Sequence, residues 1–253
     1  MGSGHLDKDS APSADEIVEE AQRRIQTRQQ ETLSPKKRRL VIDANRVVFR
    51  LSKHWLALFN TVAGLYTLGA ILAAVLMALD FVKIANVLYL FYKPFCHQYS
   101  FRSFFLYGDA FTHPLTSPLS IGEMAQQSSF TGHAQLGYKM ALCQRDMAIY
   151  GTMLLTGLLF ALFRRRKNIP PLPLWQYFIF CLLPMLLDGG VQWLSYFIWT
   201  IFPGVLAQPF ETIPLMRVLT GGLFGFGVIA VTYPYIDMYF QEIQVNLSEK
   251  FGW

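Results

Sequence analysis

Two short motifs far apart in the chain carry thiols, an imidazole and a carboxylate. Cys96 and His97 are adjacent, and Cys143 precedes Asp146 by three residues. Two sulfurs, one imidazole nitrogen and one carboxylate oxygen form a donor set that suits tetrahedral Zn²⁺. The two motifs therefore predict a zinc site formed by Cys96, His97, Cys143 and Asp146.

The spacing leaves other roles for these residues open. Cys96 and Cys143 would form a persistent disulfide in an oxidising compartment. Asp146 would equally serve at the start of a helix, where the helix dipole favours a carboxylate. Metal, disulfide and free thiols are three alternatives that spacing does not separate. Cys181 lies in an apolar stretch, where we expect it to pack against its neighbours.

Asp188 is the only charged residue in the apolar stretch Trp175–Phe202. A carboxylate at bilayer depth costs at least about 2.5 kcal/mol, so it needs a polar partner or water. Gln192 and Ser195 follow at i+4 and i+7 and extend the same helical face. This stripe is compatible with a proton or ligand site, and equally with a structural network that fixes helix register.

Arg217 begins the next apolar stretch, and Gly221 and Gly225 lie on its face with small-xxx-small spacing. We expect the helix that contains Asp188 to pack against this face, with Arg217 turned toward the bundle and Asp188 deeper within it. The polar pocket predicted between the helices contains Arg102, Arg145, Asp188, Gln192 and Arg217.

Four charge-poor, apolar stretches must position these residues. Each is long enough, or nearly so, to cross a hydrocarbon core of about 30 Å as a helix. Hydrophobic residues make up 53% of the chain and charged residues 15%, against about 25% charged in soluble proteins. We predict an all-α, polytopic integral membrane bundle with four transmembrane helices, at about Trp55–Leu79, Met147–Phe163, Trp175–Phe202 and Val218–Tyr239.

The cations flank these stretches on one side of the predicted membrane. Seven fall between Lys36 and Lys53, and four form the run Arg164–Lys167. The positive-inside rule places both regions, and with four spans both termini, in the cytoplasm. We therefore predict a multi-pass protein of the inner (plasma) membrane. Anionic lipid headgroups, rather than nucleic acid, account for the formal charge of +5.

We expect three parts: a cytoplasmic region at 1–53, a transmembrane domain at 54–240 with a long non-cytoplasmic loop at 80–146, and a cytoplasmic tail at 241–253. The first dozen residues are polar, so we expect no secretory signal. A cytoplasmic amphipathic helix is predicted by the capping residues Ser13 and Glu16 and by the apolar stripe Ile17, Ala21 and Ile25.

Two further segments border the first span. Residues 40–53 mix apolar and basic side chains, which predicts a helix in the headgroup layer. Trp55 then occupies the place of an interfacial aromatic anchor. The aromatic-rich segment Phe81–Phe95 is too short to span alone, and we expect it to prolong the first helix or to lie along the surface.

Several short motifs, in a fixed order between about Lys93 and Ile236, resemble the domain of unknown function 2085 family of small bacterial and archaeal membrane proteins. They are Cys96-His97-Gln98, Arg102-Ser103-Phe104, Cys143-Gln144-Arg145, Ile149-Tyr150, Pro184, Asp188-Gly189, Gln192, Arg217, Thr220-Gly221, Leu223 and Gly225.

The resemblance implies a membrane module with no assigned activity. The chain departs from the family pattern at Asp146, where a second cysteine is usual, and in the unusually long segment between Phe105 and Cys143. The first departure disfavours a Cys₃His zinc site and leaves a mixed-ligand site open. The second, together with the N-terminal helix, is typical of specialisation for a partner.

Two functions fit these features. The first is an accessory or structural subunit of a larger membrane complex, whose outer cluster is stabilised by metal or disulfide; we find none of the usual nucleotide, hydrolase or metalloprotease motifs. The alternative is a membrane enzyme or carrier for a small anionic or lipid-like ligand, with His97 as base or ligand and Asp188 as proton carrier. The expected partners are the lipid bilayer and other membrane-protein subunits. Zinc is the one cofactor predicted.

Overall fold

The computed structural model describes residues 18–20, 22–23, 34–113, 115, 126–165, 169–202 and 204–253. The chain divides into two compact units, Met1–Leu51 and Ser52–Trp253. The predicted capping box and most of its helix, including Ser13, Glu16, Ile17, Ala21 and Ile25, lie outside the described residues.

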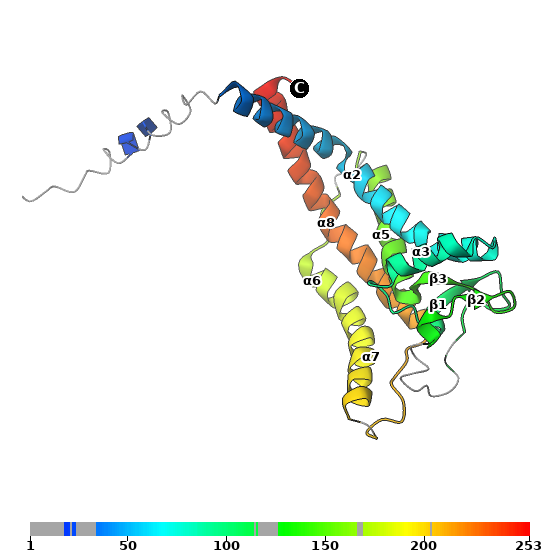
Figure 1. The fold of residues 1–253 in the computed structure, drawn as a ribbon. Helices are drawn as coiled ribbons and strands as arrows, with labels where there is room; N and C mark the ends of the chain where they lie inside the picture. The colour runs from blue at the N-terminus through cyan, green and yellow to red at the C-terminus, as the bar shows by residue number, and fades with distance from the viewer. Residues whose placement is uncertain are drawn as a thin grey trace, which may run out of the picture. The chain divides into compact units, whose positions relative to one another are not determined.

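Four helical runs are long and apolar enough to cross a membrane, as predicted. The protein is therefore a mainly helical, multi-pass integral membrane protein (Figure 1). The first run is one continuous helix that also contains the basic segment 40–53. The runs are α2 (Pro35–Ala78), α5 (Gln144–Phe163), Leu174–Ile201, and α8 (Pro214–Phe251); the third combines α6 (Leu174–Gln176), the π-helix η2 (Tyr177–Leu182) and α7 (Leu183–Ile201).

The aromatic-rich segment after α2 forms a separate helix, α3 (Val82–Tyr92), and does not prolong the first span. The break lies at Asp80, whose φ of 63° is left-handed and ends the helical path. One face of α3 is buried through Ala85, Tyr89 and Tyr92. The opposite face leaves its apolar side chains exposed, as a helix in contact with lipid would.

A small antiparallel sheet follows α3 and was not predicted from the sequence. It contains β1 (Ser103–Leu106), β2 (Gly132–His133) and β3 (Gly137–Cys143) in the order β1-β3-β2, after a short 3-10 helix, η1 (Ser100–Arg102). Register pairs Ser103 with Cys143, at the point where β3 leads directly into α5. The sheet therefore connects the long loop to the start of the second span.

Close packing of α8 against α5 holds the centre of the bundle. A side chain at Gly225 would place its Cβ 2.3 Å from the carbonyl oxygen of Ile149, and one at Gly221 would lie 2.7 Å from that of Arg145. The small-xxx-small face of α8 thus faces the second span, and the prediction that it packs against the third is wrong. The third span meets a different face of α8, where Gly227 lies against Cys181.

A proline within α8 allows a hydrogen bond between α8 and the segment that leads into α6. Pro234 has no N–H, so the carbonyl of Ala230 lacks its usual partner within α8. The backbone N–H of Leu172 donates to that carbonyl at 3.0 Å instead. An extended segment therefore lies beside an apolar helix with this pair of polar groups satisfied.

Aromatic residues fill the other end of the α2, α5 and α8 interface. Trp55 is 1% exposed and packs against Phe160, Tyr233 and Phe240. Its ring is therefore enclosed by protein, and the prediction of an interfacial anchor for Trp55 is wrong. Since its partners come from α5 and α8, Trp55 is a core residue that holds three spans together.

Candidate functional site

Glu211 lies between α7 and α8 and is the centre of a polar network. Its carboxylate accepts hydrogen bonds from Arg102 (Nε, 3.1 Å), Arg217 (2.5 Å) and Gln192 (2.6 Å), and from the hydroxyl of Tyr196. These donors come from η1, α8 and α7. One carboxylate thus joins three elements that are distant in sequence.

Arg217 is 3% exposed and directs its guanidinium into the bundle, as predicted. Besides Glu211, it donates to the side chains of Thr212 and Gln144, both at 3.1 Å, and to the carbonyl oxygen of Phe101 at 3.3 Å. The planar guanidinium has several donors in fixed directions, which suits such a junction. Its contacts connect the starts of α5 and α8 to η1.

Arg102 is bound to the same carboxylate from the opposite side. Burial alone would lower the pKa of its guanidinium, but the hydrogen bond and ion pair with Glu211 outweigh burial and raise it. Its guanidinium carbon also lies 4.8 Å from the centre of the Tyr196 ring. Arg102 is therefore held as a cation by an anion and an aromatic face.

Asp188 forms a second ion pair, with Arg145 near the start of α5. The hydroxyl of Thr220 donates to the same carboxylate oxygen at 3.1 Å. Asp188 therefore lies near the beginning of α5. Its partner is Arg145, whereas Arg217 binds Glu211. Nε of Arg145 is buried without a partner among the described residues.

Three of the four predicted zinc ligands come together. The sulfurs of Cys96 and Cys143 and an oxygen of Asp146 all lie within 4.8 Å of one another. The sulfur of Cys143 lies 3.1 Å from a carboxylate oxygen of Asp146. The backbone nitrogen of Cys143 lies 3.3 Å from the Cys96 sulfur. Contact with the Cys96 thiol, burial and the nearby carboxylate raise the pKa of Cys143. All three cysteines are free thiols.

His97 is not part of this cluster. Cys96 and Gln98 are buried, while His97 between them is exposed. Its ring stacks on that of Tyr99, with centroids 5.5 Å apart. The irregular backbone between α3 and η1, which includes a left-handed φ of 56° at Gln98, therefore leaves His97 outside the cluster although it is adjacent to Cys96 in sequence.

Lys139 of β3 is fully buried beside the thiol cluster, and no carboxylate of the described residues pairs with its ammonium group. Its ammonium donates to the carbonyl oxygens of Gln98 (2.5 Å) and Ser128 (3.0 Å). Burial lowers the pKa of Lys139 to about 8, and the electrostatic influence of Cys96 opposes this in part. The hydroxyl of Tyr89 donates to the Lys139 carbonyl and fastens α3 to the sheet.

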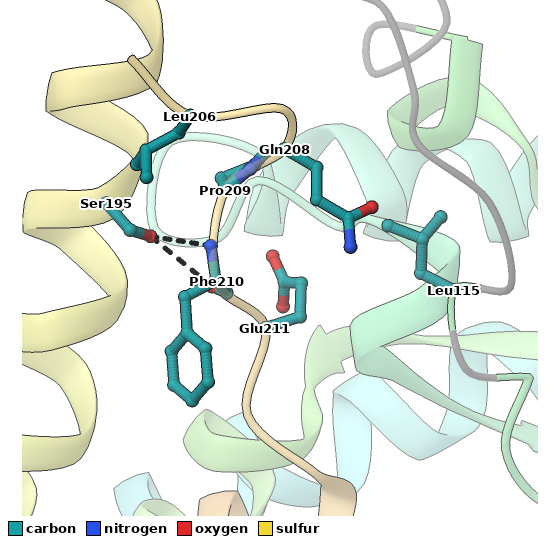
Figure 2. Close-up of a pocket in the computed structure, with 7 residues that line it drawn as sticks. All are labelled: Leu115, Ser195, Leu206, Gln208, Pro209, Phe210 and Glu211. Atoms are coloured by element: carbon teal, nitrogen blue, oxygen red, sulfur yellow. Dashed lines mark hydrogen bonds between the residues drawn. The ribbon is translucent and has the colours of Figure 1, made fainter.

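Figure 2 shows a cleft of about 510 Å³ beside Glu211. The Ser195 hydroxyl accepts a hydrogen bond from the backbone N–H of Phe210 at 2.9 Å, which fixes the loop to α7. Glu211 and Gln208 supply polar groups to the cleft, and Leu115 lies opposite. The charged group that lines this cleft is a carboxylate, so its surface does not favour an anion.

Comparison with known proteins bears on the membrane module. Residues 126–231 match the family described as predicted membrane protein (DUF2085). The predicted resemblance to this family is confirmed. The match includes Cys143, Arg145, Asp188, Glu211 and Arg217, and it begins after Cys96.

One curated relative is similar over a longer part of the chain. An uncharacterized protein of Methanocaldococcus jannaschii is 26% identical over 167 residues, which cover 65% of this chain and 80% of the relative. No solved structure matches the chain significantly. The comparisons thus support a membrane protein and assign no activity.

Sequence reasoning missed Glu211, Lys139, Gln144 and Tyr196. Glu211 had a detectable signal, since it is the only acidic residue between Asp188 and Asp237 and lies six positions before Arg217. An isolated carboxylate between two apolar spans needs a cation nearby. Lys139 had no comparable signal, because the strand that buries it was not predicted. Gln144 is part of the motif Cys143-Gln144-Arg145, but the motif alone did not indicate its contact with Arg217.

Proposed function

We propose that the protein is a subunit of a larger membrane assembly, in which the Glu211 network and a metal-bound Cys96–Cys143–Asp146 cluster hold the outer ends of the helices. The observation that carries this proposal is how little the spans bury within the chain. Within the most apolar 18 residues of each run, the share of residues that are buried is 22% for α2, 17% for α5, 17% for Leu174–Ile201 and 33% for α8.

A self-contained bundle packs one broad face of each helix against its neighbours. Here α7 leaves large apolar side chains uncovered, with Trp193 67% exposed and Leu194 and Phe197 close to half exposed. Lipid is able to cover such a face, and so is another helix. A narrowly packed bundle with a rigid polar end is typical of a protein that presents its helices to other subunits.

The polar network supports the same function. Arg102 and Arg217 bind Glu211, and Arg145 binds Asp188. Arginines that already contact carboxylates are not available to an anionic substrate. The geometry therefore favours a structural network over the predicted pocket for an anionic ligand.

The thiol cluster fits a zinc ion. Ligand atoms around tetrahedral Zn²⁺, at about 2.0–2.3 Å from the metal, lie about 3.5–3.8 Å apart. The three donors lie within 4.8 Å of one another, and the Cys143 and Asp146 donors are 3.1 Å apart, so small shifts of the side chains suffice to reach that arrangement. Zinc would join the end of α3 to the start of α5.

Extraction from native membranes tests the subunit proposal. We expect the protein to leave the membrane in a mild detergent as part of a complex, and a photo-crosslinking residue at Trp193 to capture a discrete membrane polypeptide. Native mass spectrometry should give a mass that exceeds the 28.9 kDa of the chain by more than bound lipid accounts for. A chain that is always alone, with only lipid adducts at Trp193, would overturn the proposal.

Metal analysis tests the cluster separately. The purified protein should contain about one zinc per chain, and Cys143→Ser should lose it. Cys181→Ser is the matched control, since Cys181 packs against Gly227 away from the cluster and its variant should keep the metal. A Cys96–Cys143 disulfide in metal-free protein, seen by non-reducing mass spectrometry, would contradict the zinc site.

A further inference from the structure

A second cleft, of about 460 Å³, lies between α2 and α5 at the end of α5 that is farthest from Arg145. Its polar residues come from α2 and from the two residues that follow α5, and both helices contribute apolar residues. The lining residues are Lys53, His54, Leu56, Ala57, Asn60, Thr61, Leu158, Ala161, Arg164 and Arg165.

The charge of this cleft is positive. Lys53, Arg164 and Arg165 line it together with His54, and none of the lining residues is acidic. Arg164 is partly neutralised, because it donates to Asp237 at 2.5 Å. Arg164 is also placed over Trp55, at 5.9 Å from the ring centre. Lys53 and Arg165 contribute two further positive charges to the lining of the cleft.

The floor of the cleft is apolar and extends along the helices. Leu56 and Ala57 form it on α2, and Leu158 and Ala161 on α5. Thr61 lies eight residues beyond Lys53, or about 12 Å along a helix. The cations are therefore at one end of the cleft, the apolar side chains lie next to them, and Asn60 and Thr61 lie at the far end on α2.

The cations also lie at the depth where headgroups are expected. Asp237, the partner of Arg164, is twenty residues from Arg217 along α8. Twenty residues of helix correspond to about 30 Å, which is the thickness of the hydrocarbon core. If the Arg217 network marks one boundary of the membrane, Arg164 marks the other.

We infer that this cleft binds an anionic phospholipid, with the phosphate at Lys53 and Arg165 and the start of an acyl chain over Ala57 and Leu158. Basic pockets between helices on the cytoplasmic side are suited to such headgroups. A free phosphate would gain nothing from the apolar floor. The positive-inside rule predicts that this end faces the cytoplasm, where anionic lipids are available.

Lipid competition in nanodiscs tests the inference. Wild-type protein in phosphatidylcholine nanodiscs that contain some phosphatidylglycerol should retain phosphatidylglycerol selectively, as counted by native mass spectrometry. The double variant Lys53→Gln, Arg165→Gln should lose about 30-fold in this selectivity, since each cation near the surface contributes about fivefold. Lys250→Gln is the matched control, because it removes an exposed cation of α8 that does not line the cleft.

A second variant separates a shaped site from general attraction. Ala57→Trp keeps every cation and fills the exposed floor, so it should also lose selective retention. Circular dichroism melting should show both variants folded. The inference is overturned if Ala57→Trp retains the lipid, if the double variant behaves as wild type, or if inorganic phosphate displaces the lipid.

Discussion

Glu211, and not the Asp188 singled out by the sequence, is the carboxylate at the centre of the polar network. Each carboxylate occupies a position between apolar helices, and each is matched by arginine. Glu211 receives two guanidinium groups, whereas Asp188 receives one together with a hydroxyl. Since Arg217 is almost fully buried, the loss of its anion would leave a cation without charge compensation.

Replacement of Glu211 by Gln should therefore destabilise the protein by about 3–5 kcal/mol, the range for removal of one partner of a buried ion pair. The free energy of unfolding in detergent, measured with denaturant, gives the effect. Glu249→Gln is the control, because Glu249 is exposed on α8 and should change stability little. Equal stabilities of the two variants would show that the network does not hold the helix ends.

Lys139 predicts a pH dependence. Its pKa is lowered from 10.5 to about 8 in the folded protein, so between pH 8 and 10.5 the unfolded chain binds more protons. Lys139 should therefore contribute a rise in the free energy of unfolding through this window, of the order of 3 kcal/mol. Cys143, whose pKa is raised, contributes in the opposite direction, so the measured quantity is the difference between wild type and Lys139→Met. Lys139→Met should remove this rise relative to wild type, and an unchanged slope would contradict the burial of the ammonium group.

At the scale of elements, Pro234 and Leu172 are coupled through one carbonyl. Leu172→Pro removes the donor to Ala230 and should cost about 1–3 kcal/mol, the penalty for a buried unsatisfied group. In a Pro234→Ala background, the N–H of the new alanine is able to satisfy the same carbonyl. The same Leu172→Pro change should then cost clearly less. A double-mutant cycle measures this difference, and simple additivity would refute the coupling.

The helices were predictable because their signal is local. Length and the absence of charge identify a span from a single window of sequence, and all four spans were found. The partner of each helix was not predictable in this way. Gly221 and Gly225 identify a face that allows close approach, but their spacing does not say that α5 rather than α7 packs there.

The candidate site was predictable only in part, for the same reason. Cys96, Cys143 and Asp146 were identified by residue type, and the fold brings them together. His97 is exposed outside the cluster because of the irregular backbone between α3 and η1, which no local motif predicts. Glu211 acquires its partners only when three separate elements meet, so no motif contains it.

At the scale of the whole molecule, two polar layers border the unit Ser52–Trp253. Glu211 and Asp188 lie in one layer, and the Arg164–Asp237 pair lies in the other. Their spacing along α8 matches the hydrocarbon thickness, at about 30 Å. The layer that contains Arg164 carries the excess of cations, so the positive-inside rule predicts that it faces the cytoplasm.

Cysteine labelling tests this orientation. Asp109 and Lys250 are both exposed, one beyond β1 and one near the end of α8. In intact cells, a membrane-impermeant maleimide should label an Asp109→Cys variant, whereas Lys250→Cys should react only after permeabilisation, because the two positions are predicted to lie on opposite sides. The wild-type chain gives the background from Cys96, Cys143 and Cys181. Labelling of Lys250→Cys in intact cells, with Asp109→Cys protected, would reverse the orientation and place the thiol cluster at the cytoplasmic end.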